Sequence, residues 1–201
     1  MKSVIAFDAD GVIFNFILMF SKVYEKLYKE KFIIYPNRGS ISGQFEDISN
    51  APIDRVIKVV DYCISSEAID NTPFIPRAVE VLNKMFKNYQ LPIITKRPKE
   101  THTKLLDYFH KNLPNVADIE IFCTEDAIDS KIEVLNKIGC SYFVDDRLET
   151  CCSFWKKGIH AILFECVTNQ IFLNRVQKEY PFYPNIFRNW DEVEIFLKTI
   201  M

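Results

Sequence analysis

The sequence predicts an α/β protein with a doubly wound, mainly parallel sheet and a small helical insertion. Short apolar runs recur along most of the chain, and segments with the 3.6-residue period of a helix lie between them. Near-continuous apolar strands separated by single helices are typical of a parallel sheet covered on both faces. The pattern breaks only between residues 15 and 73, where helical periodicity continues without a buried strand.

Each element of the core is expected from a particular run. Strands are expected at residues 4–7, 91–94, 119–122, 142–144 and 161–164. Helices are expected where apolar residues share one face, around residues 79–86, 105–109 and 128–138, and a last helix is expected near Asp191 and Glu192. The crossovers that join parallel strands are expected to be right-handed.

The break in the pattern is interpreted as a cap inserted into this core. Helical patterns cover residues 16–29 and 52–65. We therefore expect a helical cap at residues 15–73 and an α/β core made of residues 1–14 and 74–201.

Composition excludes several classes of protein. Of the 201 residues, 48% are hydrophobic and 26% charged, and the formal net charge is −2, so no basic excess is present to bind a nucleic acid polymer. The longest apolar stretch, residues 11–20, is about half the ~20 residues that a membrane span needs. The first residues lack the layout of a signal peptide, and the six cysteines form no CxxC pair. A cytoplasmic protein with free thiols and no membrane contact is expected, and a homodimer stays open.

The glycines exclude two common phosphate-binding motifs. Only five are present, at positions 11, 39, 43, 139 and 158. Neither GxGxxG nor GxxxxGK[ST] can be assembled from them, so any phosphate chemistry needs another arrangement of residues.

Polar residues gather where the expected strands and helices begin or end. In open α/β sheets, ligands bind in the crevice outside the carboxyl ends of the strands. The residues delivered to this edge are Asp8 and Asp10 after the first strand, Thr95 after the second, Lys131 in a helix, and Asp145 and Asp146 after the fourth strand.

This set of side chains suits phosphoryl transfer with magnesium. Carboxylates that cluster repel one another unless a cation lies between them, and oxygen ligands without nearby His or Cys favour Mg²⁺. Gly11 would allow the chain to bend after Asp10. Thr95 and Lys131 would bind phosphate oxygens, which leaves Asp8 to attack phosphorus and Asp10 to move the proton. Any one of these pieces alone could be an ordinary turn or helix cap.

The ordered set resembles the motifs of the haloacid dehalogenase (HAD) superfamily of aspartate-nucleophile phosphotransferases, whose core is Rossmann-like. Residues 7–13 (FDADGVI) look like the first motif, Thr95 matches the second, Lys131 the third, and residues 144–146 (VDD) the fourth. The resemblance covers most of the chain outside the insertion. One departure is Arg77, which stands where a glycine is common.

The resemblance implies a role for each matching residue. Asp8 would be the nucleophile and a metal ligand, and Asp10 the general acid/base and, through its backbone carbonyl, a second ligand. Asp145 would hold Mg²⁺ directly and Asp146 would support it. An insertion between the first and second motifs implies a C1-type cap.

A thinner resemblance concerns the substrate. Residues 94–98 (ITKRP) and 143–147 (FVDDR) look most like the deoxyribonucleotidase-like branch of the superfamily. Lys96, Arg97 and Arg147 would then lie in the substrate pocket, although Arg97 and Arg147 could equally be surface charges or partners of Asp126 or Glu149. Three aromatic residues that follow the nucleophile, Phe14, Phe16 and Phe20, are candidates for the pocket wall or for the hydrophobic core.

The function expected from these observations is Mg²⁺-dependent hydrolysis of a small phosphorylated metabolite, with a nucleoside monophosphate as the first candidate. Two alternatives stay open, a sugar phosphomutase and a binding protein that keeps the fold without turnover. Dehalogenation is disfavoured, because Asp10 and the second acidic pair have roles with magnesium and the leaving group and none in displacing halide.

Overall fold

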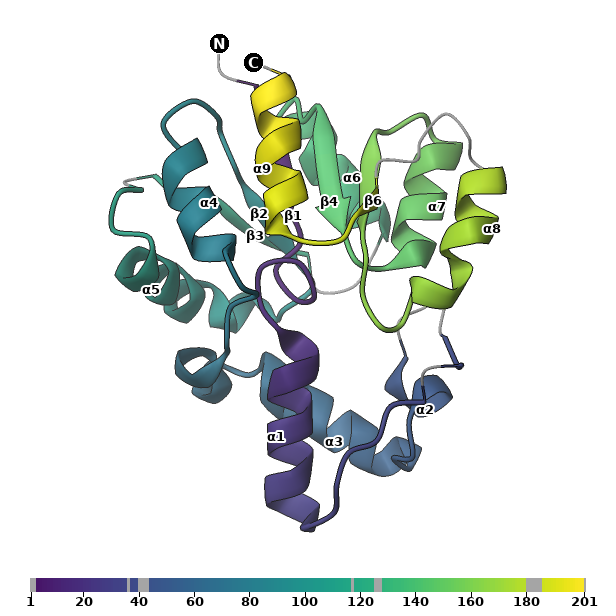
Figure 1. Cartoon of the computed structure of the whole chain (residues 1–201). Coiled ribbons are helices and arrows are strands. Elements are labelled where there is room, and N and C mark those ends of the chain that lie inside the picture. Colours follow the sequence, from purple (N-terminus) through teal and green to yellow (C-terminus); the bar gives the residue numbers. More distant parts are fainter. Residues whose placement is uncertain are drawn as a thin grey trace.

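A single parallel sheet forms the centre of the molecule (Figure 1). The computed structural model describes residues 3–35, 37–39, 44–116, 118–124, 128–179 and 186–200. Within them the sheet has six strands in the order β3-β2-β1-β4-β5-β6, and every pairing is parallel. The strands are β1 Ile5–Phe7, β2 Ile93–Thr95, β3 Ile121–Cys123, β4 Tyr142–Asp145, β5 Ala161–Phe164 and β6 Ile186–Phe187.

Helices cover both faces of this sheet, which confirms the predicted doubly wound α/β class. Side chains alternate between faces along a strand, so Ile5 and Phe7 pack in one hydrophobic cluster and Ala6 in the other. The first cluster includes residues of α4 Ala78–Met85, α5 His102–Asn112 and α9 Trp190–Thr199. The second includes residues of α6 Ile128–Lys137, α7 Leu148–Lys156 and α8 Leu173–Glu179.

The chain between β1 and α4 forms helices at one end of the sheet (Figure 1). They are α1 Phe16–Tyr28, α2 Phe45–Ile48, α3 Ile53–Ile64 and the 3-10 helix η1 Ser66–Asn71. Asn15 caps α1, because its Oδ1 accepts a hydrogen bond from the backbone N–H of Leu18 at 3.1 Å. These helices share a third hydrophobic cluster, separate from the two that flank the sheet.

Two short connections join this helical segment to the sheet, and they lie side by side. The N–H of Asn15 donates to the carbonyl of Pro73 at 2.7 Å, and the N–H of Ile75 donates to the carbonyl of Ile13 at 2.8 Å. The entry and exit of the segment are therefore tied to each other directly after the β1 loop. The division at residues 15–73 stays a prediction.

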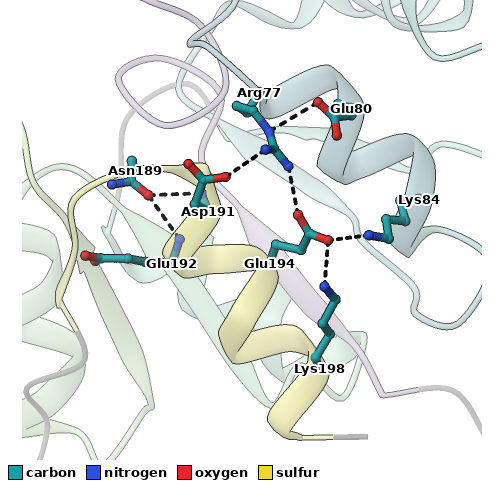
Figure 2. A network of polar contacts seen from close by, with 8 residues as sticks. All are labelled: Arg77, Glu80, Lys84, Asn189, Asp191, Glu192, Glu194 and Lys198. Carbon is teal, nitrogen blue, oxygen red and sulfur yellow. Dashed lines mark hydrogen bonds and ion pairs between the residues drawn. The ribbon is translucent and has the colours of Figure 1, made fainter.

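A polar network holds α9 against α4 (Figure 2). The carboxylate of Glu194, whose side chain is 10% exposed, pairs with Arg77 at 2.9 Å, with Lys198 at 2.8 Å and with Lys84. Hydrogen bonds from Lys198 and Lys84 lower the pKa of Glu194 to about 2. Arg77 has φ of 70°, in the left-handed region that favours glycine, so the backbone there has the conformation expected where glycine is common.

Two further findings bear on the class of protein. None of the six cysteines, all within the described residues, forms a disulfide. In the same part of the chain, no helix has the length and apolar character needed to cross a bilayer.

Candidate active site at the carboxyl edge of the sheet

The proposed nucleophile lies where the strand order reverses. β1 and β4 are neighbours at this switch point, the place where open α/β sheets bind ligands. Asp8 follows β1 directly, and its backbone N–H donates to the carbonyl of Val144 in β4 at 2.8 Å. The residue is only 6% exposed, so its carboxylate is held inside the protein at the sheet edge.

The loop after Asp8 is closed by its own backbone and by one distant side chain. The N–H groups of Ile13 and Phe14 both donate to the carbonyl of Ala9, at 3.0 and 2.8 Å. Trp190 Nε1 donates to the carbonyl of Val12 at 2.8 Å. Backbone hydrogen bonds thus hold the loop at residues 9–14 in a tight turn. Trp190, the first residue of α9, anchors this loop from near the end of the chain.

Position 11 requires glycine for two reasons, its backbone conformation and the closeness of the Asp146 side chain. Its φ of 86° is in the left-handed region, and a Cβ added there would lie 2.0 Å from Asp146 Oδ2. The predicted bend is confirmed, and it lets the Asp146 carboxylate rest directly on the loop that carries Asp8 and Asp10.

Lys131 links the two buried acidic positions. Its Nζ donates to Asp8 Oδ1 at 2.6 Å and to Asp145 Oδ2 at 2.7 Å. The exposed fractions of these side chains are 1% for Lys131, 9% for Asp8 and 0% for Asp145. Such short, charge-assisted contacts between nearly buried side chains fix both carboxylates relative to the ammonium group.

Burial is the main influence on the pKa values of Asp8 and Asp146. Burial raises the pKa of Asp8 from 3.8 to about 7, although Lys131 lowers it and Asp145 raises it further. Burial and the neighbouring Asp145 also raise the pKa of Asp146. Burial opposes the charge of Lys131, but the carboxylates of Asp145 and Asp8 outweigh it and raise its pKa. Lys131 alone therefore does not compensate the buried negative charge.

The second predicted motif lies at the end of the adjacent strand. Thr95 ends β2 and is 1% exposed, and its Oγ1 accepts the backbone N–H of Arg97 at 3.2 Å. The Arg97 guanidinium meets Asp10 with two contacts, Nε to Oδ2 at 2.8 Å and Nη2 to Oδ1 at 2.7 Å.

A cavity of about 680 Å³ lies between this site and the helical segment. Its lining includes Asp8, Asp10, Asp146, Lys96, Arg97 and Arg147 from the sequence-derived set, together with Phe14 and Phe16. Thr95, Lys131 and Asp145 lie beneath it as buried residues. On the helical side the lining is largely apolar and includes Phe45, Val56, Ile57, Val60 and Ile64.

Of the two places left open for Phe20, the pocket wall and the hydrophobic core, the structure shows the core. Phe20 is fully buried in the core of the helical segment, with its ring 4.7 Å from Phe32 and 4.5 Å from Phe45. Positions 16 and 20 lie one turn apart on the same face of α1, and only Phe16 lines the cavity, whereas Phe20 packs inside the helical segment. Phe14 lines the cavity but is also fully buried, with its ring 5.1 Å from that of Phe109.

Asn169 is a supporting residue that the sequence did not reveal. Its Nδ2 donates to the carbonyls of Asp146 and Phe164, each at 2.8 Å, and its Oδ1 accepts the N–H of Cys166 at 3.1 Å. A buried asparagine can join the loops after β4 and β5 in this way only once the sheet has brought them together. No local pattern around position 169 signals it.

The donor set fits a magnesium ion. Burial raises the pKa of two carboxylates, Asp8 and Asp146, so ionising them is costly, and a divalent cation beside them would offset that cost. In the described residues, no three or more His, Cys, Asp or Glu side chains are arranged to hold a metal ion. Mg²⁺ does not need such a cage, because it is usually bound through one or two carboxylates, waters and the substrate phosphate. Asp8, Asp145, Asp146 and the Asp10 carbonyl would hold it here.

Comparisons with known proteins identify the fold. No protein-family model and no curated protein matches the chain. Among solved structures, a haloacid dehalogenase-like hydrolase from Streptococcus pneumoniae aligns over 98% of both chains with a TM-score of 0.64 and 13% identity. L-2-haloacid dehalogenase from Xanthobacter autotrophicus aligns over 100% of both chains with a TM-score of 0.60 and 11% identity.

A third structure, a HAD hydrolase from Bacillus subtilis bound to magnesium, covers 98% of this chain and 99% of its own, with a TM-score of 0.56 and 12% identity. The chain therefore has the fold of the haloacid dehalogenase-like hydrolases, as the motifs predicted. The fold is shared by proteins of different chemistry, so the reaction must be argued from the site.

Proposed function

We propose that this protein is a magnesium-dependent phosphatase that hydrolyses a small phosphomonoester through an aspartyl-phosphate on Asp8. One observation carries the proposal: the Asp8 carboxylate lies at the switch point of the sheet, on a large cavity, with Lys131 Nζ 2.6 Å away and bridging to Asp145. A carboxylate with a fixed cation beside it, facing a cavity, is suited to attack an anionic phosphate that would otherwise repel it.

The reaction has two steps. Asp8 attacks phosphorus, the bond to the ester oxygen breaks, and Asp10 gives that oxygen its proton, so that the alcohol leaves and the phosphoryl group stays on Asp8. A water molecule then attacks the same phosphorus and gives its proton to Asp10, which releases phosphate and restores both carboxyl groups. Thr95 and Lys131 would bind the phosphate oxygens. When bound, Mg²⁺ would neutralise charge on the phosphoryl group as it is transferred.

The helical segment at residues 15–73 would act as the cap that chooses the substrate. The catalytic residues contact mainly the phosphate, which every candidate substrate shares. Apolar side chains of α3, together with Phe16 and Phe45, line the cavity, and such a lining suits a flat or apolar leaving group. A nucleoside monophosphate fits this description, with Phe16 as the ring best placed to stack on a base.

A matched pair of substitutions tests the specificity. Phe16 lines the cavity, whereas Phe20 lies in the core of the same helix group. Phe16→Leu should lower kcat/KM for a nucleoside monophosphate more than for p-nitrophenyl phosphate. Phe20→Leu should lower thermal stability and leave the ratio of the two kcat/KM values unchanged. An unchanged ratio in Phe16→Leu would remove the base-stacking proposal and leave the phosphatase proposal intact.

An assay with p-nitrophenyl phosphate and Mg²⁺ tests the reaction class itself. Release of p-nitrophenol that needs both Mg²⁺ and Asp8 is expected. No turnover of this ester or of a panel of phosphorylated metabolites would favour the binding-protein alternative. Activity that requires a sugar bisphosphate and returns the phosphoryl group to the sugar would favour the phosphomutase.

A further inference from the structure

We propose that Arg97 is a positioning residue that holds the Asp10 carboxylate at the angle needed for proton transfer to the leaving group, and that it acts only through Asp10. The inference rests on the proposed function and adds to it a residue 87 positions further along the chain.

The contact between the two residues is a two-point clamp. Nε and Nη2 of Arg97 meet the two different oxygens of Asp10, at 2.8 and 2.7 Å. Two parallel hydrogen bonds from a planar guanidinium fix both the position of a carboxylate and the rotation of its plane. A lysine at position 97 could supply the charge but would leave that rotation free.

Arg97 is itself held firmly. Its side chain is 0% exposed, its backbone N–H is bonded to Thr95 Oγ1, and its guanidinium lies over the Phe14 ring at 5.4 Å from the centroid. Phe14 is in turn packed on Phe109 and Phe74. The clamp is therefore built on the end of β2 and on the hydrophobic core, so it has little freedom to follow Asp10 elsewhere.

The clamp still leaves Asp10 able to react. Each carboxylate oxygen has two lone pairs, and the two contacts with Arg97 use one on each oxygen. The Asp10 side chain is 21% exposed and lines the cavity, so its remaining lone pairs can reach a ligand there. Arg97 thus orients Asp10 without covering the face that would exchange a proton with the ester oxygen.

A purely structural ion pair explains this arrangement less well. Nη1 of Arg97 is buried and has no hydrogen-bond partner among the described residues, so the guanidinium is kept inside the protein with the two N–H groups of one nitrogen unsatisfied. Burying a charged group with an unmet donor costs free energy, and replacing a buried pair by apolar residues is often neutral or stabilising. The orientation of Asp10 is a functional gain that explains why this costly pair is present.

The test compares leaving groups of different quality. Arg97→Lys and Arg97→Gln are assayed with p-nitrophenyl phosphate, whose leaving group needs little protonation, and with whichever alkyl phosphomonoester the wild type hydrolyses. Because general acid catalysis is worth about 10²- to 10⁴-fold, we expect kcat to fall at least 10-fold more with the alkyl ester than with the nitrophenyl ester. KM should change little for either. Arg97→Lys keeps a charge opposite Asp10 and guards against failure to fold.

Two controls separate positioning from structure. Arg55→Gln removes another arginine that pairs with a carboxylate, Glu30 at 2.7 Å, and lies over a Tyr ring, but does not line the cavity. It should leave the ratio between the two esters unchanged. In an Asp10→Asn background, Arg97→Gln should cause no further loss of kcat, because its effect passes through Asp10.

Two results would overturn the positioning role and leave the phosphatase proposal intact. One is an equal loss of kcat on both esters. The other is that Arg97→Gln lowers kcat as much in the Asp10→Asn background as in the wild type. Absence of any Mg²⁺-dependent turnover in the wild type would instead overturn the proposed function on which the inference rests.

Discussion

The substitution Asp8→Asn is expected to abolish turnover and at the same time to stabilise the fold. Without an ionisable carboxylate at position 8, no aspartyl-phosphate can form. Asparagine has nearly the same size, so the packing around the 6%-exposed side chain is kept. What changes is the cost of holding a buried negative charge beside Asp145.

The size and the sign of the stabilisation follow from the pKa of Asp8. Burial raises it from 3.8 to about 7 in the folded protein, so the folded state favours the protonated form. The stability that Asp8 contributes is then complete below pH 3.8 and is lost as the pH rises to about 7. A difference of about three pKa units corresponds to about 4 kcal/mol. The amide donates and accepts differently towards Lys131, so a gain of about 1 to 4 kcal/mol above pH 7 is expected.

Urea unfolding in EDTA measures this gain at several pH values. The free energy of unfolding of Asp8→Asn should exceed that of the wild type at pH 8, and the difference should shrink as the pH falls towards 4. Asp118→Asn, which removes an exposed aspartate between α5 and β3, should show no such trend. A variant that is less stable than the wild type at pH 8, or a gain that does not change with pH, would refute the dominance of burial at Asp8.

Three further outcomes are expected. EDTA should abolish phosphatase activity and Mg²⁺ should restore it. Ca²⁺ should inhibit, because Ca²⁺ takes more ligands at longer distances and would engage both oxygens of Asp8. Full activity in EDTA would contradict the metal site. Lys131→Met should lower the free energy of unfolding by about 3–5 kcal/mol in metal-free protein, since Asp8 and Asp145 would lose their shared cation, and urea unfolding that shows no loss would contradict that pairing. Glu194→Gln should lower the melting temperature at neutral pH. The difference in melting temperature should disappear as the pH falls from 4.5 to about 2, because the wild type then loses the same charge. A difference that is constant with pH would contradict the ion-pair network of Figure 2.

The sequence predicted the layers of the fold well, and the deviations have local causes. The expected strand at 161–164 coincides with β5, whereas the one at 91–94 is displaced to Ile93–Thr95. Pro92 explains the shift, because proline has no N–H to donate to a neighbouring strand. β6 was not predicted, since two residues, Ile186–Phe187, are too few for an alternating pattern to be recognised.

Some residues of the candidate site could be predicted from the sequence, and others depend on how the strands and helices are arranged. Residues directly after strands were found from the sequence, because the carboxyl ends of parallel strands share one edge. The partnership of Asp10 with Arg97 depends on β1 and β2 being neighbours, which strand runs alone do not specify. On the helical side, proximity to Asp8 in the sequence suggested Phe20 as a candidate, but Phe20 packs one turn further along α1 in the core of the segment. Phe45, which begins α2, lines the cavity instead.

Trapping the covalent intermediate tests the role of Asp8 most directly. Wild-type protein incubated with Mg²⁺ and a phosphomonoester labelled in its phosphoryl group is quenched in acid within the first turnover, digested and analysed by mass spectrometry. We expect one labelled peptide, with the phosphoryl group on Asp8, and no label in Asp8→Asn. Turnover with the label on another residue, or a labelled Asp8→Asn protein with wild-type activity, would contradict the assignment of Asp8 as the nucleophile.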